Sequence, residues 1–236
     1  MTSRLWSVVF DADDPDGLAR FWAAALEWEH IDGDECPCAI GGDGVLRRLE
    51  FVPAAAPKAS PNRMHFDLSS TSLDDQRATV ERLLDLGARH IDIGQGPDAE
   101  HVVLADPEGN ELCILEPGNR FVDSRRLGSL TWDGSPAAGY FWRDALGWPL
   151  VWDQDDETAI RPPDGGLFIT FGAPRPKQTK NRLHMDLAPP PDGDQQAEVA
   201  RLVSLGATPI DIGQGDVSWV VLADPDGNEL CVLAPR

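Results

Sequence analysis

The sequence contains no uninterrupted apolar run of about 18 residues, the length that a helix needs to cross a membrane. Its N-terminal stretch, MTSRLWSVVFDADD, also lacks a long apolar segment followed by a small-residue cleavage site. We therefore expect no signal peptide, no association with a membrane and a cytoplasmic location.

Basic residues are scarce. Twenty Lys and Arg residues stand against 40 Asp and Glu residues, which gives a formal net charge of −20 at pH 7. A field of that sign repels nucleic acid and anionic membrane surfaces. The sequence therefore predicts no nucleic-acid partner, and we interpret the acidity as a source of solubility.

Cysteines are also few, at positions 36, 38, 113 and 231. Without a secretory signal, reduced thiols are expected rather than disulfides. Cys36 and Cys38 form a Cys-Pro-Cys pair, but no second pair of the kind found in structural zinc sites accompanies it. For Cys113 and Cys231 the simplest interpretation is a small buried side chain.

What the sequence does contain is a long internal repeat. The decapeptide DPEGNELCIL at 106–115 returns as DPDGNELCVL at 224–233. NRMHFDL at 62–68 returns as NRLHMDL at 181–187, and RFWAAALEW at 20–28 returns as YFWRDALGW at 140–148. Halves of this length can each bury a core. We predict two domains, at 1–118 and 127–236, joined by a linker at 119–126.

Each half shows the same order of local patterns. In the first half, residues 5–12 are rich in β-branched and aromatic side chains, and residues 13–28 have helical apolar spacing. Shorter strands follow and complete the first β-α-β-β-β unit. The second unit of the half consists of a strand, a capped helix over 72–86 and three further strands. Gly87 suits the position just after that helix. The order β-α-β-β-β therefore occurs four times, which predicts an α+β fold of four modules.

Alternation along the strand at 63–70 separates two sets of side chains. Met64, Phe66 and Leu68 face one way, and the polar set of Arg63, His65 and Asp67 faces the other. The second half repeats the polar set as Arg182, His184 and Asp186. By the same alternation, Cys113 and Cys231 point away from their apolar neighbours.

These repeated motifs, FW…LGW, NR(M/L)H(F/M)DL, LGA and ADP(E/D)GNELC(I/V)L, resemble those of the vicinal oxygen chelate superfamily, and in particular its glyoxalase-like domain branch. The superfamily includes glyoxalase I, bleomycin-resistance proteins and extradiol dioxygenases. The resemblance implies tandem domains in which two modules form a cupped mixed β-sheet with helices on the outside. It leaves the function open, because this fold supports binders, lyases, isomerases and dioxygenases.

The resemblance also implies metal ligands, His or Glu, on the first and last strand of each module. The corresponding positions are Trp6, Glu50, His65 and Cys113 in the first half, and Arg126 or Leu127, Ile169 or Thr170, His184 and Cys231 in the second. Cysteine replaces the expected carboxylate in both halves, and Trp6 cannot coordinate an ion. We therefore expect no cofactor. A zinc ion, if bound, would be held by Glu50, His65 and Cys113, or by Glu50, His184 and Cys231 if modules one and four pair.

Candidate functional residues follow from these positions. An imidazole beside a carboxylate can titrate near neutral pH, so His65 and His184 are candidates for proton transfer, together with Glu50. The alternative is that each cluster only satisfies buried polar groups. The candidate ligand-binding residues are Trp6, Arg63, Asp67, Cys113, Thr170, Arg182, Asp186 and Cys231.

Two functions remain open. The first is binding of a small aromatic or apolar organic molecule without a metal, as in the drug-binding relatives, and it rests on the lost ligands and the eight tryptophans. The second is a glyoxalase-type lyase or isomerase that uses Glu50 and His65, with or without a divalent metal. The partner in either case is a small molecule. The fused halves form a pseudo-dimer within one chain, and a homodimer is also compatible with the sequence.

Overall fold

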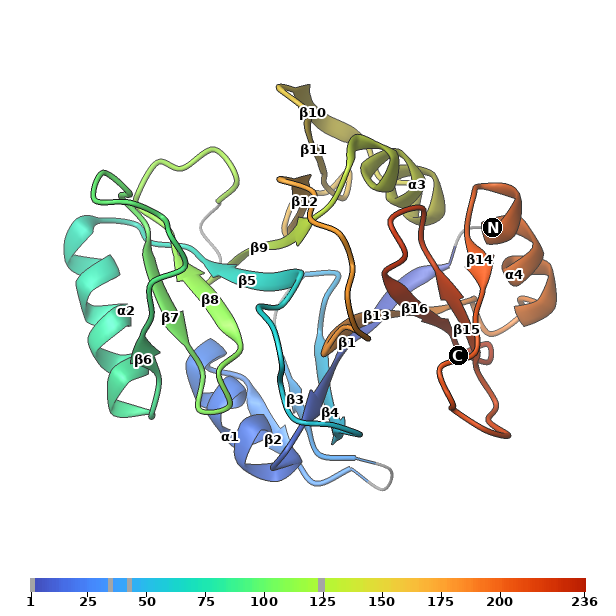
Figure 1. Cartoon of the computed structure of the whole chain (residues 1–236), viewed down its shortest axis with the longest axis horizontal. Coiled ribbons are helices and arrows are strands. Elements are labelled where there is room, and N and C mark those ends of the chain that lie inside the picture. The colour runs from blue at the N-terminus through green and yellow to red at the C-terminus, as the bar shows by residue number, and fades with distance from the viewer. Residues whose placement is uncertain (1–2, 34–35, 42–43, 123–125) are drawn as a thin grey trace.

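A computed structural model describes residues 3–33, 36–41, 44–122 and 126–236, and the fold is α+β (Figure 1). In this part of the chain the β-α-β-β-β order occurs four times, as the sequence predicts. Of the predicted linker, residues 119–122 and 126 belong to the described part of the chain and residues 123–125 lie outside it. Modules one and two form the first half and modules three and four the second.

The elements have the following bounds. Module one comprises β1 (Arg4–Ala12), α1 (Pro15–Leu26), β2 (Glu29–Ile31), β3 (Cys38–Ile40) and β4 (Arg48–Pro53). Module two comprises β5 (Met64–Leu68), α2 (Leu73–Asp85), β6 (Arg89–His90), β7 (Val102–Ala105) and β8 (Glu111–Ile114). Module three comprises β9 (Leu127–Asp133), α3 (Pro136–Leu146), β10 (Leu150–Gln154), β11 (Glu157–Ile160) and β12 (Phe168–Gly172). Module four comprises β13 (Leu183–Ala188), α4 (Gln195–Ser204), β14 (Thr208–Pro209), β15 (Val220–Ala223) and β16 (Glu229–Val232).

The helix ends follow from local chemistry. The side chain of Asp14 accepts a hydrogen bond from the backbone N–H of Gly17 at the start of α1, and Ser72 accepts one from Asp75 at the start of α2. After α2 the chain turns through Gly87 at a φ of 105°, a conformation that favours glycine. The predicted role of Gly87 is confirmed.

Strand pairing joins the two halves. In sheet A the strand order is β14-β15-β16-β13-β1-β4-β3-β2, and in sheet B it is β10-β11-β12-β9-β5-β8-β7-β6. The central strands of each sheet, β1 with β13 and β5 with β9, run antiparallel. Sheet A is therefore built from modules one and four, and sheet B from modules two and three. Of the two pairings that the sequence leaves open, this is the one that the chain adopts.

The helix-covered faces of the two sheets share one hydrophobic core. Phe10 of sheet A and Phe66 of sheet B have ring centroids 5.6 Å apart, and Trp22 of α1 packs against both rings. Trp22 and Trp142 are fully buried, as the helical spacing predicts. Helices α2 and α4 lie at opposite ends of the molecule (Figure 1). The surface of each sheet opposite its helix-covered face is free of these helices. We call this surface face A on sheet A and face B on sheet B.

The repeated decapeptide forms a turn that ties the modules together. The carboxylate of Asp106 accepts hydrogen bonds from the backbone N–H groups of Glu108 and Asn110, from the Asn110 amide and from the Trp22 indole, at 2.8–3.1 Å. Asp224 is bonded in the same way to its own turn and to Trp142. Most of the repeated motif therefore serves the fold.

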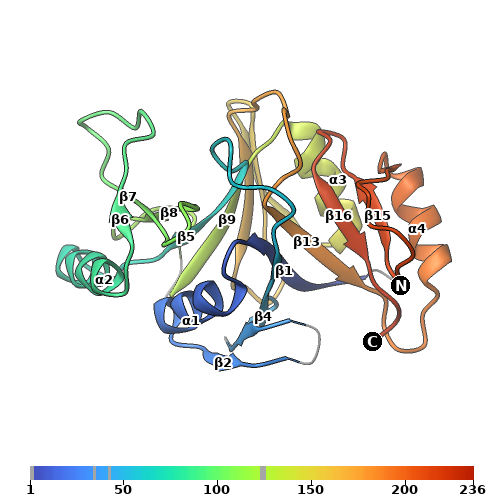
Figure 2. The same cartoon turned by 60° about the horizontal axis from the view of Figure 1, so that its bottom comes forward.

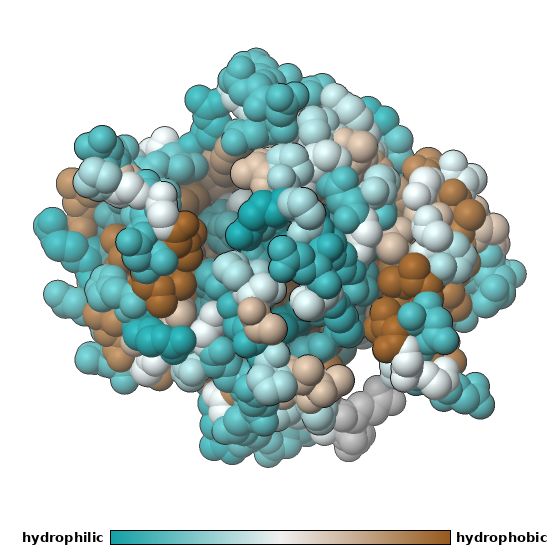
Figure 3. All heavy atoms as spheres, in the orientation of Figure 1, coloured by the Kyte–Doolittle hydropathy of each residue, from teal (hydrophilic) through white to brown (hydrophobic). Residues whose placement is uncertain are grey.

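The surface in the view of Figure 3 is mainly hydrophilic, with small separate hydrophobic patches. Among the described helices, none is both long and apolar enough to cross a membrane. The composition of the surface agrees with the charge excess in the sequence.

Candidate functional site

Face B carries a cluster of an imidazole, a carboxylate and a thiol. On β5 the side chains of Met64, Phe66 and Leu68 enter the shared core, which leaves His65 and Asp67 on face B. The neighbouring strand β8 places Cys113 directly beside Asp67. One ligand atom from each of His65, Asp67 and Cys113 lies within 4.8 Å of the other two. The alternation of the sequence predicts this convergence.

Asp67 is the most heavily bonded member of the face B cluster. Its Oδ1 lies 3.3 Å from Nε2 of His65, and its Oδ2 accepts hydrogen bonds from the hydroxyls of Ser129, at 2.7 Å, and Thr131, at 2.5 Å. Burial disfavours the carboxylate, but His65 and the two hydroxyls outweigh it and lower the pKa of Asp67. For His65, burial is outweighed by Asp67 and Cys113, which raise its pKa well above the ordinary value. The pair is therefore an imidazolium and a carboxylate at neutral pH.

Face A carries the corresponding cluster, with weaker hydrogen bonding. His184, Asp186 and Cys231 again bring one ligand atom each to within 4.8 Å of one another. The hydroxyl of Ser7 is 3.4 Å from Oδ2 of Asp186, and Val9 stands opposite His184 where Thr131 stands opposite His65. Oδ1 of Asp186 lies 3.4 Å from Nε2 of His184, as in the face B pair, and within the described part of the chain Oδ1 of Asp186 and Nδ1 of His184 make no hydrogen bond. Face A therefore has polar atoms that a ligand could satisfy.

Charge distribution also differs between the faces. Burial lowers the affinity of His184 for a proton, but Cys231 and Asp186 outweigh it and raise its pKa to about 10. Glu50 lies on β4 beside Val9, and its counterpart on β12 beside Thr131 is Thr170. Burial, aided by the nearby charge of Asp186, raises the pKa of Glu50 despite its ion pair with Arg48. Face A therefore brings Glu50 to its cluster at the position where face B has Thr170, whereas on face B the carboxyl group of Asp133 interacts electrostatically with His65.

The two thiols are poorly suited to nucleophilic attack. Burial raises the pKa of Cys113, and this effect exceeds the opposing influence of His65. Burial likewise raises the pKa of Cys231 in spite of His184. Since the thiolate is the reactive form, both cysteines are neutral thiols near pH 7.

The register refines the positions at which the superfamily holds its metal. In each sheet a local two-fold axis relates the two central antiparallel strands to each other. On sheet A this axis passes between Val8 and Met185. This axis relates Glu50 to Cys231 and Ser7 to His184. The first-strand position is therefore Ser7, and not Trp6 as the sequence comparison places it, because a β-bulge at Trp6 shifts the register by one residue. In sheet B the same position is Ser129, and not Arg126 or Leu127.

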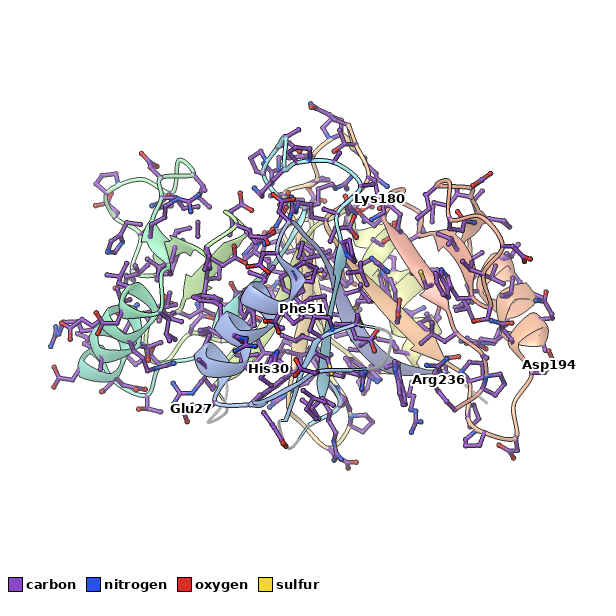
Figure 4. All side chains as sticks on the ribbon, turned by 90° about the horizontal axis from the view of Figure 1, so that it is seen from below. Glu27, His30, Phe51, Lys180, Asp194 and Arg236 are labelled. Atoms are coloured by element: carbon purple, nitrogen blue, oxygen red, sulfur yellow. The ribbon has the colours of Figure 1, made fainter. Side chains whose placement is uncertain are left out.

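Trp6 still lies at face A, beside a pocket. The guanidinium groups of Arg4 and Arg236 lie 4.9 and 5.5 Å from its ring centroid, and Arg236 is labelled in Figure 4. Trp6 also packs against the small apolar cluster that contains Cys231. A pocket of about 450 Å³ is lined by Arg4, Leu5, Trp6, Ile40, Gly44, Val45, Arg47, Arg48 and Trp148.

The structure places Arg63 and Arg182 apart from both clusters. Arg63 donates to the main-chain oxygens of Asp133, at 2.9 Å, and Asp226, at 3.5 Å. Arg182 donates to the main-chain oxygen of Asp11 and to the carboxylate of Glu108. Both guanidinium groups therefore connect elements of different modules rather than extend the His–Asp–Cys clusters.

Face B also has an aromatic wall, of which the sequence indicates only Trp152, as a strand tryptophan able to line the cup, and not Phe121 or Phe168. Phe121 lies 6.3 Å from Trp152 and 5.8 Å from Phe168, both in edge-to-face geometry. Arg120 stacks over Trp152 at 4.0 Å, and Arg161 lies over Phe168 at 4.4 Å. These residues come from the predicted linker and from module three, so no sequence motif groups them. The strand register gives the signal, because Trp152, Ala159 and Thr170 are successive neighbours across β10, β11 and β12.

Comparisons with known proteins agree with this arrangement. The family model described as glyoxalase-like domain matches the chain twice, at residues 7–115 and 130–233. Glyoxalase I from Zea mays is similar in structure, with a TM-score of 0.63 and 13% identity over 99% of this chain and 92% of that chain. A proposed dioxygenase from Bacillus subtilis gives a TM-score of 0.63 and 14% identity over 100% of this chain and 86% of that chain. No curated protein matches the chain.

Proposed function

Because the chain belongs to the glyoxalase-like domain family in both of its halves, we propose that it binds a small organic molecule, aromatic or apolar, on face B without the help of a metal. The single observation that carries the proposal is the aromatic wall of Phe121, Trp152 and Phe168 on the face that carries the His65–Asp67–Cys113 cluster, where Phe168 is the strand neighbour of Ser129, which donates to Asp67. Flat aromatic surfaces next to a few fixed polar groups are typical of small-molecule sites.

The polar groups of face B suit the orientation of an organic guest. The hydroxyls of Thr131 and Thr170 are 2.8 Å apart and lie in the same row as His65. The indole Nε1 of Trp152 is buried and has no partner among the described residues. A guest that carries a carbonyl or hydroxyl oxygen would accept a hydrogen bond from this indole or from the His65 imidazolium, while its ring contacts the aromatic wall.

The metal positions of face B fit an ion poorly. They hold Ser129, Thr170, His65 and Cys113, so hydroxyls stand where carboxylates would bind a hard cation. The nearby carboxylate of Asp67 is already engaged by His65, Ser129 and Thr131.

Face A fits a zinc ion better. Imidazole, carboxylate and thiolate are all zinc ligands. Nδ1 of His184 has no hydrogen-bond partner among the described residues, and the contacts of Asp186 to His184 and Ser7 are both at 3.4 Å. On this face His184, Asp186 and Cys231 would hold the ion, with Glu50 beside them. A bound zinc ion would polarise adjacent oxygens of a substrate.

Thermal stabilisation by a panel of small aromatic compounds tests the proposed function. A compound that binds face B raises the melting temperature of EDTA-treated protein, and the rise increases with the logarithm of its concentration above the Kd. Trp152→Ala should lower the affinity for that compound by roughly thirtyfold, the effect of losing an aromatic hot spot. Trp219→Ala removes an indole that is 39% exposed on module four and serves as the matched control. Equal affinity in the two variants, or no stabilisation by any compound, would count against the proposal.

A second candidate function rests on Glu50. A carboxyl group with a raised pKa, across β1 from His184 and within electrostatic reach of Asp186, could move a proton at a carbon next to a carbonyl group, as a lyase or isomerase requires. Solvent deuterium incorporated into a small hydroxyketone by wild-type protein, and lost in Glu50→Gln, would favour this activity on face A. Incorporation at equal rates in the two proteins would exclude Glu50 from it.

A further inference from the structure

A second pocket lies away from both faces, where the two halves of the chain meet. The loop 54–63 connects modules one and two, and the loop 173–182 connects modules three and four. The two loops lie side by side (Figure 2), and Arg175 of the second donates to the main-chain oxygen of Asn62 in the first, at 3.3 Å. Together they enclose about 410 Å³. We call this cavity the seam pocket.

The lining of the seam pocket is basic, although the protein is strongly acidic. Five of the 20 basic residues line it, with Asp11 as the single acidic side chain among its lining residues. The five are Lys58, Arg63, Arg175, Lys180 and Arg182, and Lys180 is labelled in Figure 4. A random distribution of charge in a chain of net charge −20 would place more acid than base there. The pocket therefore gathers a quarter of the basic residues at one place, although carboxylates in and around its lining pair with most of them.

Four of the five cations are paired with carboxylates. Lys58 contacts Glu111 at 2.7 Å, Lys180 contacts Asp11 at 2.5 Å, and Arg175 contacts Asp133. Arg182 contacts Glu108 at 2.7 Å and lies 3.6 Å from Asp13. The capacity to bind a further anion therefore depends on Arg63, and on the one donor of Arg182 that makes no hydrogen bond to the described residues.

Arg63 and Arg182 are each 8% exposed and each retains an unused donor. Nε of Arg63 and Nη1 of Arg182 are buried and make no hydrogen bond to the described residues, although Nη1 of Arg182 lies 3.6 Å from the carboxylate of Asp13. In the same part of the chain, no carboxylate lies within ion-pair distance of Arg63, which donates to two main-chain oxygens. A buried guanidinium with unmet donors is costly, and an oxyanion would satisfy it.

We propose that the seam pocket is a binding site for a small molecule that carries an oxyanion, a phosphate or a carboxylate group, between Arg63 and Arg182. The repeated Asn-Arg pair of the two halves is thereby assigned to this pocket, one arginine from each half. The alanines and prolines of the same lining, among them Ala56, Pro57 and Pro176, offer an apolar wall for the rest of the ligand. This site is separate from face B and does not depend on the function proposed there.

Phosphate and succinate titrations test the proposal, with sodium chloride at matched ionic strength as the baseline. The site predicts that at least one of the two anions raises the melting temperature above that baseline by mass action. Phosphate alone would indicate a phosphorylated ligand, succinate alone a carboxylated one, and both a general oxyanion site. No rise above chloride for either anion would overturn the proposal.

Gln178→Glu adds a negative charge to the pocket wall at an exposed position and leaves both arginines in place. The substitution should lower the affinity for the stabilising anion by about tenfold through like-charge repulsion. Gln154→Glu makes the same change on β10, at an exposed position outside the pocket lining, and should leave the affinity unchanged. Arg63→Lys and Arg182→Lys should also weaken binding, because lysine lacks the planar set of donors. Equal affinity in Gln178→Glu and Gln154→Glu would overturn the assignment even if both lysine variants fail to fold.

Discussion

Asp106→Ala is expected to lower the free energy of unfolding by about 4 kcal/mol or more, because it leaves four donors without an acceptor and each buried unsatisfied group costs ~1–3 kcal/mol. The Asp106 side chain is fully buried and accepts from two backbone N–H groups, the Asn110 amide and the Trp22 indole. Loss of the last contact also separates the turn from α1. Urea denaturation followed by circular dichroism measures the effect.

Asp98→Ala provides the control, since Asp98 is exposed in the same module and an exposed substitution of this kind changes stability by about 0.5 kcal/mol or less. Asp224→Ala, at the equivalent turn of module four, should match Asp106→Ala because Asp224 makes the same four contacts. A loss in Asp106→Ala no larger than that in Asp98→Ala would show that the repeated motif does not stabilise the fold through this carboxylate.

Asp67→Asn is expected to destabilise the protein by about 3 kcal/mol at neutral pH, because removal of one charge from a buried ion pair leaves the other uncompensated. Asp67 pairs with His65 and accepts from two hydroxyls. Asp186→Asn is the matched variant on face A. There the nearest hydroxyl, that of Ser7, is at 3.4 Å and Glu50 adds a like charge. We therefore expect Asp186→Asn to lose less stability than Asp67→Asn, with a difference of at least about 1 kcal/mol.

The pH dependence of the Asp67→Asn effect follows from the direction of the pKa shift. The folded-state pKa of Asp67 is lowered, so its contribution to stability is present above the ordinary aspartate pKa and is lost as pH falls through the lowered value. The difference between wild type and Asp67→Asn should therefore shrink in acid. Equal losses in Asp67→Asn and Asp186→Asn, at all pH values, would contradict the contrast between the two faces.

Much of this architecture could be predicted from residue patterns. Alternation along NRMHFDL and NELCIL correctly placed Met64, Phe66 and Leu112 in the core and His65 and Cys113 on the opposite face. Those patterns are local, and a strand's two faces are determined by its own sequence. The duplication then carried the same inference to the second half.

Features that depend on which strands meet could not be read from the sequence. Pairing of module one with module four, which places Glu50 beside Asp186, depends on contacts between residues far apart in the chain. The bulge at Trp6 shifts the register by one residue, and a single misplaced residue assigns the wrong side chain to the metal position. Phe121 and Trp152 meet only after the chain folds, so the aromatic wall of face B carries no motif.

The most direct test of binding on face B is a threonine-methyl NMR titration of EDTA-treated protein with the tightest compound of the aromatic panel. Thr131 and Thr170 lie beside the His65 cluster, whereas Thr79 and Thr208 lie in α2 and β14. We predict that the methyl resonances of Thr131 and Thr170 shift with saturation while those of Thr79 and Thr208 remain in place. Shifts that spare Thr131 and Thr170, or that appear only after zinc is added, would contradict binding of an organic molecule to face B without a metal.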